Sequence, residues 1–398
     1  MKRKLFAALA AAALLVTTAG CADSGSSQSE DDTYLLFVDT GLTGATQTAS
    51  QVALAAIEGA AKVINDAGGI NGRQLVVESV DSQGDPTRAV TLLQEKLASG
   101  DKPDLVFAGL SSAETLAMLP VLTRNRIPSF GNSSSPAIND PQAYPYHFGF
   151  AQDAAAQLNS LKAELNRRGI KKLAVLRSQD AYGDGVANGV KAVVGGDIEI
   201  IDTAYNPQDI DLSVAWQRAA GAGADAIYSD CFGDPCPRLF NGRLAAGVTD
   251  VPTIFGSGPS ATGSGPVGFA DEASFENLDV TIWNYLRYVP PAQRTENFNA
   301  MYSAVVGTGG QPAGTLLPAI IAWDGVRMLS KAIEAADSGD AEAVVGAVLA
   351  SAEPPGTWLT APEGTIKFTA ESHFPAPYDG LMIFAKPGPL VDGLFQID

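Results

Sequence analysis

The strongest constraint on the fold is an alternation of short apolar segments with longer segments of helical spacing, which begins at Tyr34. This alternation is typical of βα units built around a parallel sheet. A first series runs to about residue 130. It predicts strands at 34–38, 75–79, 105–108 and 127–130, and helices at 45–66, 86–99 and 113–124.

A second series of the same kind follows an extended stretch at 144–151 and a helix at 153–168. Two such series predict an α/β fold with two doubly wound lobes and a ligand cleft between them. The predicted strands of this second part are 172–176, 199–204, 226–228, 253–255, 280–283, 366–368 and 381–384. The predicted helices are 185–194, 212–220, 237–246, 293–306, 319–336 and 341–351, with a long loop at 256–268.

The amino-terminal residues 1–20 have the order of a secretory signal, with three basic residues ahead of an apolar run at 5–16. This run of about a dozen residues is short of the roughly 20 that a membrane-spanning helix needs. The signal ends in Thr-Ala-Gly-Cys, which resembles a bacterial lipobox and predicts that Cys21 becomes the lipid-modified first residue. An ordinary signal with an incidental cysteine is the alternative. Residues 21–32, rich in Ser and acidic side chains, are expected to be a disordered tether.

The charge balance argues against nucleic acid as a partner. The chain of 398 residues carries 26 basic and 44 acidic side chains, a formal net charge of −18, and lacks the clustered Lys and Arg that phosphate backbones require. Signals for an enzyme are also missing, since the sequence has no Gly-x-Ser-x-Gly, His-Glu-x-x-His or Walker motif. We therefore expect no catalytic residue, no cofactor and no metal site, and the only two histidines, His147 and His373, are far apart in the sequence.

Two polar loops follow neighbouring strands of the first series. The first loop opens the helix at 113–124, and the start of a helix attracts anions through its free N–H groups and its dipole. The second loop follows the strand at 127–130, and carboxyl ends of parallel strands meet at one edge of a sheet. Hydroxyls in such places also serve as helix caps or turn formers, which is the alternative. The candidate ligand-binding residues of the two loops are Ser111, Ser112, Asn132, Ser133 and Ser134.

Several ordered motifs give the chain a family resemblance. The stretches Asp39–Gly44, Asp66–Arg73, Asp81–Ala89 and Asp180–Gly183 resemble, in order and spacing, the type I periplasmic binding proteins of the branched-chain amino acid ABC importers. The resemblance covers about 34–398 and implies that the chain passes between two lobes three times. It implies a first lobe of 33–150 with 286–380 and a second lobe of 151–285 with 381–398.

The resemblance also implies roles for individual residues. Ser112 and the segment 132–134 would hold a ligand carboxylate, and Tyr182 would close over the ligand from the second lobe. The alternative is that Tyr182 only begins a helix. The loop after the strand at 226–228, which carries Asp230 and Phe232, would add a further ligand-facing aromatic ring.

At one place the chain departs from the resemblance. Amino acid binders of this family pair the ligand ammonium with a carboxylate in the loop after the strand at 253–255, where this chain has Gly-Ser-Gly-Pro at 256–259. A buried ammonium needs a compensating charge, which Asp230 or Asp180 could supply. Otherwise the solute is an amide, a urea-like compound or a small carboxylate. Trp283 and Tyr285 are expected either to wall the cleft or to lie in the core.

The two remaining cysteines, Cys231 and Cys236, are predicted to form a disulfide, because the protein is expected outside the cytoplasm and Cys21 is committed to lipid. The bridge would brace the loop that carries Asp230. Since the closed loop is short, positioning is expected to matter more than global stability.

The sequence thus predicts a lipid-anchored, extracytoplasmic solute-binding protein that acts as a monomer. It would close over a small solute and deliver it to ABC permease subunits. The alternative is an extracytoplasmic ligand sensor of the same fold that acts on a signalling partner.

Overall fold

The computed structural model describes residues 33–43, 46–133, 135–151, 154–231, 235–261, 265–307, 311–376 and 380–397. The predicted signal at 1–20 and the tether at 21–32 with Cys21 lie outside the described residues, as do Ser134 and Phe232. Within the described part of the chain, no helix combines the length and the apolar character needed to cross a membrane.

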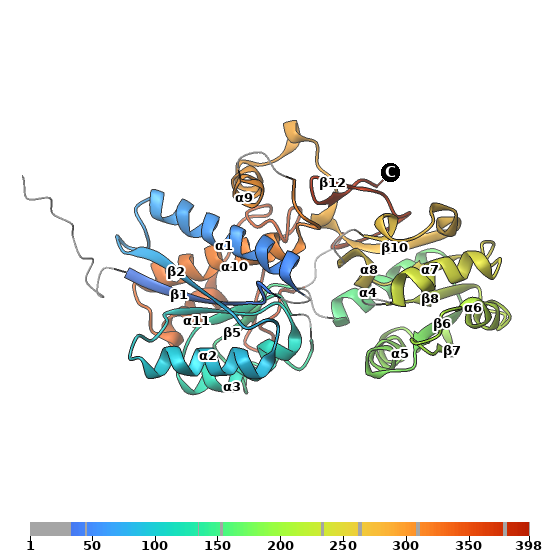
Figure 1. Ribbon diagram of the computed structural model, residues 1–398, viewed down its shortest axis with the longest axis horizontal. Coiled ribbons are helices and arrows are strands. Elements are labelled where there is room, and N and C mark those ends of the chain that lie inside the picture. Colours follow the sequence, from blue (N-terminus) through green and yellow to red (C-terminus); the bar gives the residue numbers. More distant parts are fainter. Residues whose placement is uncertain are drawn as a thin grey trace, which may run out of the picture.

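The chain folds into two α/β lobes that lie side by side (Figure 1). The sheet of the first lobe is fully parallel, with the order β2-β1-β3-β4-β5. Its strands are β1 (Thr33–Thr40), β2 (Gln74–Asp81), β3 (Leu105–Ala108), β4 (Ser129–Gly131) and β5 (His147–Gly149). The helices around it are α1 (Gln47–Asp66), α2 (Pro86–Ala98), α3 (Ser112–Arg124), α9 (Glu296–Val306), α10 (Leu317–Ala336) and α11 (Ala341–Ala350).

Alternate side chains of the central strands bury themselves on opposite faces of this sheet. Leu36 and Phe107 lie in the core that contains α1 and α10, whereas Phe37 and Val106 lie in the core that contains α2 and α3. A strand buried on both faces reads as a continuous apolar run, which explains why the sequence pattern marked these strands clearly.

The second lobe is built on a six-stranded sheet with the order β11-β10-β9-β8-β6-β7, in which β11 alone is antiparallel to its neighbour. Its strands are β6 (Lys172–Ser178), β7 (Glu199–Tyr205), β8 (Ala226–Ser229), β9 (Thr253–Phe255), β10 (Leu278–Trp283) and β11 (Met382–Ala385). The helices of this lobe are α4 (Ala154–Arg167), α5 (Ala181–Val193), α6 (Ser213–Ala220), α7 (Pro235–Ala245) and the short α8 (Gly258–Ala261). Short 3₁₀ turns are η2 (Pro266–Gly268), η3 (Glu272–Phe275), η4 (Asn284–Leu286) and η5 (Pro291–Gln293).

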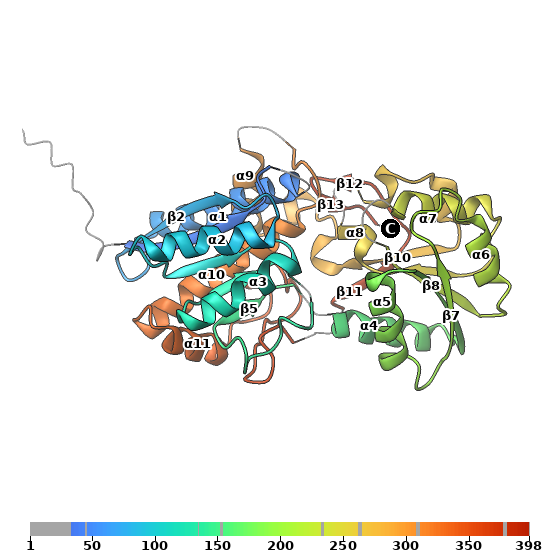
Figure 2. The same cartoon turned by 60° about the horizontal axis from the view of Figure 1, so that its bottom comes forward.

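The polypeptide passes between the lobes three times. After β5 of the first sheet it continues into α4, which packs in the second lobe, and after β10 it returns to α9, which packs on α1. After α11 it crosses again to form β11, which pairs with β10. Figure 2 shows α9 in the first lobe and α4, β10 and β11 in the second.

The C-terminal segment adds a small hairpin of β12 (Leu390–Val391) and β13 (Leu394–Phe395) beside these connections. The Tyr288 N–H donates to the Phe395 carbonyl at 2.8 Å, and the Leu316 N–H, just before α10, donates to the Gly393 carbonyl at 2.9 Å. The hairpin therefore ties the second connection to the first lobe.

Three predictions of local structure need correction. The segment 366–368 is not a strand: Ile366 and Phe368 are buried, but the Phe368 ring packs against Phe148 and Phe150 at centroid distances of 5.1 and 5.5 Å. Ring packing rather than a strand ladder accounts for its apolar pattern. The helix expected at 185 begins four residues earlier as α5, and the expected loop at 256–268 contains α8.

Candidate ligand-binding site

The first half of the candidate site is the start of α3, at the carboxyl edge of the first sheet. Ser111 is the N-cap, and its Oγ accepts from the Glu114 N–H at 3.2 Å. In return Glu114 Oε2 accepts from the Ser111 N–H at 3.1 Å and from the Ser111 Oγ at 2.7 Å. This reciprocal cap occupies the Ser111 hydroxyl and fixes the helix end, whose first N–H groups point out of the helix.

The structure brings the two predicted serine loops together. Ser112 Oγ lies 2.7 Å from Ser133 Oγ, although the residues follow different strands. The Asn132 N–H donates to the Gly109 carbonyl at 3.5 Å, which holds the second loop against the first. Two hydroxyls beside a helix start form a subsite with the chemistry to receive a carboxylate or an equivalent oxygen.

The second half of the site is the start of α5 in the other lobe. Asp180 is its N-cap, and Asp180 Oδ1 accepts from the Gly183 N–H at 2.8 Å and from Ser178 Oγ at 2.7 Å. The Asp180 carboxylate is therefore engaged in the cap. Tyr182, in the first helical turn, is 42% exposed, which is unusual for a large aromatic side chain in this protein. Its ring offers apolar surface for a bound molecule.

Asp230 follows β8 and lies beneath Tyr182. Its Oδ1 accepts from the Cys231 N–H at 2.9 Å and from the Gly258 N–H at 3.2 Å. Burial raises the pKa of Asp230 to about 7, against the opposing effect of these N–H groups and of the Tyr182 hydroxyl. Burial of its hydroxyl end, together with the charge of Asp230, raises the pKa of Tyr182 far above its ordinary value, although the rest of the ring is exposed. The donors that contact Asp230 in the described chain are neutral, so the carboxyl group is without a cationic partner there.

The glycines of the loop after β9 make room for this carboxyl group. A Cβ atom on Gly256 would collide with Asp230 Oδ2, and one on Gly258 would lie 2.8 Å from Asp230 Oδ1. Asp230 thus occupies the space into which a side chain at 256 would project, whereas at 258 the Cys231 carbonyl, 2.3 Å from a Cβ, is a nearer obstacle. The carboxyl group of Asp230 therefore fills the space in which an acid at 256 would lie.

Two tyrosines next to Asp230 were not predicted as site residues. Tyr205 ends β7 and Tyr228 lies in β8, and both are buried. Burial, with Asp180 and Asp230 nearby, raises the pKa of Tyr205 to about 12, while Ser178 opposes the shift. The sequence pattern assigned both rings to buried strands. The signal that could have found them is an aromatic residue near the carboxyl end of two strands of the same sheet, β7 and β8, which flank β6.

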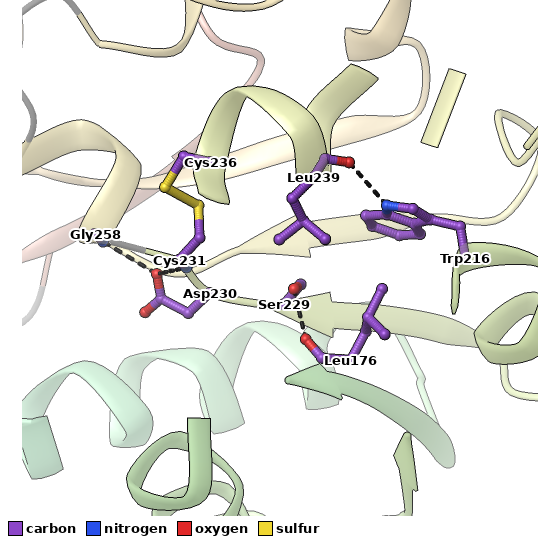
Figure 3. Close-up of a disulfide and its surroundings, with 8 residues drawn as sticks. All are labelled: Leu176, Trp216, Ser229, Asp230, Cys231, Cys236, Leu239 and Gly258. Atoms are coloured by element: carbon purple, nitrogen blue, oxygen red, sulfur yellow. Dashed lines mark hydrogen bonds between the residues drawn. A yellow bond between two sulfur atoms is a disulfide. The ribbon is translucent and has the colours of Figure 1, made fainter. Parts of the chain in front are cut away.

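Cys231 and Cys236 form a disulfide in the structure, and both are buried (Figure 3). The bond links the end of β8 to the first turn of α7. Because Cys231 also donates its N–H to Asp230, the bridge restrains the backbone that holds the carboxyl group.

Trp283 and Tyr285 belong to the core. They are 4% and 6% exposed, and their rings stack with a centroid distance of 5.8 Å.

The described residues contain no group of three or more His, Cys, Asp or Glu placed to hold a metal ion. Two surface hollows, of about 500 and 430 Å³, are lined by 136–142 with 370–371 and by 267–268, 311–314 and 389–393. Neither hollow contains a candidate site residue.

Comparison with known proteins places this geometry in a family. A family model described as periplasmic binding protein matches residues 38–380. A Leu/Ile/Val-binding protein homolog 3 from Brucella melitensis is 27% identical over 177 residues, which is 43% of this chain and 47% of that protein. The match therefore spans about half the length of this curated relative.

Solved structures match over nearly the whole chain. The branched-chain amino acid transporter substrate binding protein LivJ from Streptococcus pneumoniae, in complex with isoleucine, gives a TM-score of 0.68 at 16% identity and covers 92% of this chain and 99% of its own. A solute binding protein of an ABC transporter from Rhodopseudomonas palustris, in complex with 3,4-dihydroxy benzoic acid, gives 0.67 at 18% identity and covers 92% and 96%. At these identities the likeness shows the fold.

The predicted two-lobed α/β fold and the predicted family are both confirmed, because the family model spans most of the chain and the neighbouring structures share its architecture. The proteins it resembles are described as substrate-binding proteins rather than enzymes. The chain belongs to the type I periplasmic binding protein family.

Proposed function

We propose that this protein is an extracytoplasmic substrate-binding protein of an ABC importer that holds a small polar solute between its two lobes and closes over it. The observation that carries the proposal is the pair of hydroxyls, Ser112 and Ser133, 2.7 Å apart at the start of α3. Ligands of α/β sheets bind at the carboxyl ends of the strands, where this pair lies.

The proposed solute carries a carboxylate or an equivalent oxygen at the serine pair. The isoleucine and the 3,4-dihydroxy benzoic acid in the neighbouring structures both have a carboxylate, but only isoleucine has an ammonium group. In this protein Asp230 would receive the opposite end of the solute, either as a carboxylate facing an ammonium group or as a carboxylic acid facing a neutral acceptor. Tyr182, Asn132 and the backbone at Ser111 complete the proposed site, with Ser134 and Phe232 proposed on the family pattern alone.

The proposal extends to the cellular setting. Secretion through the signal at 1–20, anchoring by lipid at Cys21 and a tether at 21–32 would keep a monomer at the outer face of the cell membrane, near ABC permease subunits. The proposed lobes are 33–150 with 286–380 and 151–285 with 381–398, which is supported by the sheets in which the strands lie.

Isothermal titration calorimetry with a panel of amino acids, amides and carboxylates tests the proposal. Ser112→Ala removes one hydroxyl of the pair and is expected to weaken the binding of a carboxylate solute by about tenfold, the value of one charge-assisted hydrogen bond. Ser99→Ala, at the far end of α2, is the matched control with unchanged affinity.

A second variant tests the other lobe. Tyr182→Ala is expected to weaken binding by a similar factor while leaving the melting temperature close to that of the wild type, since the ring is half-exposed. Ala replacement of the fully exposed Ile210 is its control. The proposal fails if a well-folded sample binds no member of the panel, or if neither site variant changes the affinity.

A further inference from the structure

A second buried acid lies next to the serine pair. Asp39, near the end of β1, is fully buried, and neither of its carboxyl oxygens has a hydrogen-bond partner among the residues that the structure describes. β1 is paired with β2 on one side and with β3 on the other, so the backbone at Asp39 is flanked by a strand on each side. An unpartnered buried carboxylate is costly, because no solvent or donor replaces its lost hydration.

Asp39 lies beside the acid that organises the anion subsite. Glu114 is 1% exposed, and its Oε1 accepts from Ser82 Oγ at 3.1 Å while its Oε2 serves the Ser111 cap. Gly109 separates the two acids: a Cβ at this position would lie 3.2 Å from Asp39 Oδ2 and 3.1 Å from Glu114 Cβ. The backbone of Gly109 also has a φ of 82°, so a glycine suits this position for two reasons.

The two buried acids differ in their donors. Glu114 accepts from the Ser82 hydroxyl and from the backbone and side chain of Ser111. Neither carboxyl oxygen of Asp39 accepts a hydrogen bond from the described residues, since the nearby Ser82 hydroxyl donates to Glu114, and burial without such bonds favours the neutral form of Asp39. Two neighbouring buried carboxyl groups without a cation do not both ionise readily.

The charged groups around Asp39 act in the same direction. Burial raises the pKa of Asp39 to about 7, with contributions from the charges of Glu114 on α3 and Asp81 at the end of β2, and with the Ser82 hydroxyl opposing. The guanidinium of Arg88 on α2 donates instead to the Asp81 carbonyl at 3.0 Å.

We propose that Asp39 is a proton-coupled affinity determinant of the anion subsite: it holds a proton while a carboxylate occupies the Ser112 and Ser133 hydroxyls, and it releases that proton more readily when the subsite is empty. The inference rests on the proposed function of that subsite. An ionised Asp39 would add a negative charge beneath the helix start that attracts the anion. A bound anion in turn raises the cost of ionising Asp39, because coupling between two sites is reciprocal.

The sign of the pH dependence follows from this coupling. A bound anion makes the Asp39 proton harder to remove. The affinity for a carboxylate is therefore highest at low pH, where Asp39 is protonated in both the free and the bound protein. Affinity falls as the pH rises through neutrality and becomes constant again once Asp39 is ionised in both states. A solute without a carboxylate shows no such fall.

The test measures dissociation constants from pH 5.5 to 8.5 by calorimetry, with L-leucine, benzoate and its neutral isostere benzamide as probes. If a bound carboxylate raises the pKa of Asp39 by about one unit, benzoate binding weakens between pH 5.5 and 8.5 by about fivefold or more relative to benzamide, because any titration of Asp230 affects these two isosteres alike. Repeating the titration at pH 7.5 in buffers of different ionisation enthalpy is expected to show uptake of about half a proton per carboxylate bound.

Asp39→Asn is the decisive variant, because an amide has nearly the size and polarity of the protonated acid but cannot ionise. The ratio of the benzoate dissociation constants at pH 8.5 and 5.5, divided by the same ratio for benzamide, is expected to fall to near one in this variant. Asp324→Asn, at another fully buried acid on α10 whose pKa is raised to about 6, is the matched control that keeps the wild-type ratio.

The outcomes separate the inference from the function on which it rests. Carboxylate binding without proton uptake, or a pH ratio that persists in Asp39→Asn, overturns the inference and leaves the proposed function standing. The first result would mean that Asp39 keeps one charge state throughout. Absence of binding by every probe and every member of the solute panel overturns both.

Discussion

At the scale of single residues, the site is defined by acids without cationic partners in the described chain. Asp230 is 9% exposed and receives only neutral donors, two of which are backbone N–H groups. Its raised pKa of about 7 places its ionisation near neutral pH. A positively charged group of a solute would neutralise the Asp230 carboxylate, whereas a neutral hydrogen-bond acceptor would bind to the protonated form of Asp230.

Asp230→Asn distinguishes these two possibilities. If the natural solute has an ammonium group, the variant loses its counter-charge, and affinity for L-leucine is expected to fall by about 100-fold at pH 8, since a buried charge pair is broken. Benzoate, without an ammonium group, is expected to change by less than about threefold. Calorimetry of the two probes on the same preparations checks this, and equal losses for both would contradict a role in ammonium recognition.

At the scale of elements, the sequence predicted those strands and helices whose apolar residues recur at regular spacing. The strand at 105–108 and the strand at 253–255 have the predicted bounds, because each is a short β-prone run that ends at a glycine, Gly109 or Gly256. The start of α5 was placed too late, since the Asp180 cap precedes a run of glycines with poor helix propensity. The failed strand at 366–368 has an apolar pattern that aromatic packing satisfies equally well.

The site was predictable only in part for the same reason. Ser112 and Ser133 follow strands of one sheet, so topology brings them together. The proximity of Asp39 to Glu114, and of Tyr205 to Asp180, depends on side-chain packing across strands that are far apart in the sequence. Periodicity carries no information on such contacts.

The disulfide is the element-scale feature with a measurable stability. It closes a loop with a sequence separation of 5, for which the chain-entropy model gives about 2 kcal/mol. Double replacement of Cys231 and Cys236 by Ser is expected to lower the free energy of unfolding by this amount in urea titrations. Wild-type protein measured with and without a reductant is the control. A far larger loss would show that the bridge supports the whole second lobe rather than one loop.

At the scale of the whole molecule, three connections and the C-terminal hairpin join two lobes, each built on its own sheet. The core of α2 and α3 and the core of α4 and α5 share no residue, whereas a third hydrophobic cluster contains buried residues of both lobes, among them Leu36 and Ile227. The hairpin is hydrogen-bonded to Tyr288, in the second connection, and to Leu316, just before α10. These two bonds restrain the second connection against the first lobe. Motion is therefore expected as rotation about the connections.

Small-angle X-ray scattering tests this expectation. A solute that contacts both lobes only in the closed form shifts the population toward that form, so the radius of gyration is expected to decrease when a saturating solute is added. The Ser112→Ala variant at the same solute concentration is expected to show a smaller decrease. An unchanged radius at proven saturation would contradict closure.

The contact between Asp230 and the glycines of the next loop has an evolutionary consequence. Because the Asp230 carboxyl group fills the space over Gly256, an acid at 230 and a large side chain at 256 exclude each other. The two positions should therefore change together among relatives. Moving the acid from one loop to the other would take a paired exchange, in which each single substitution passes through an intermediate with either two crowded groups or none.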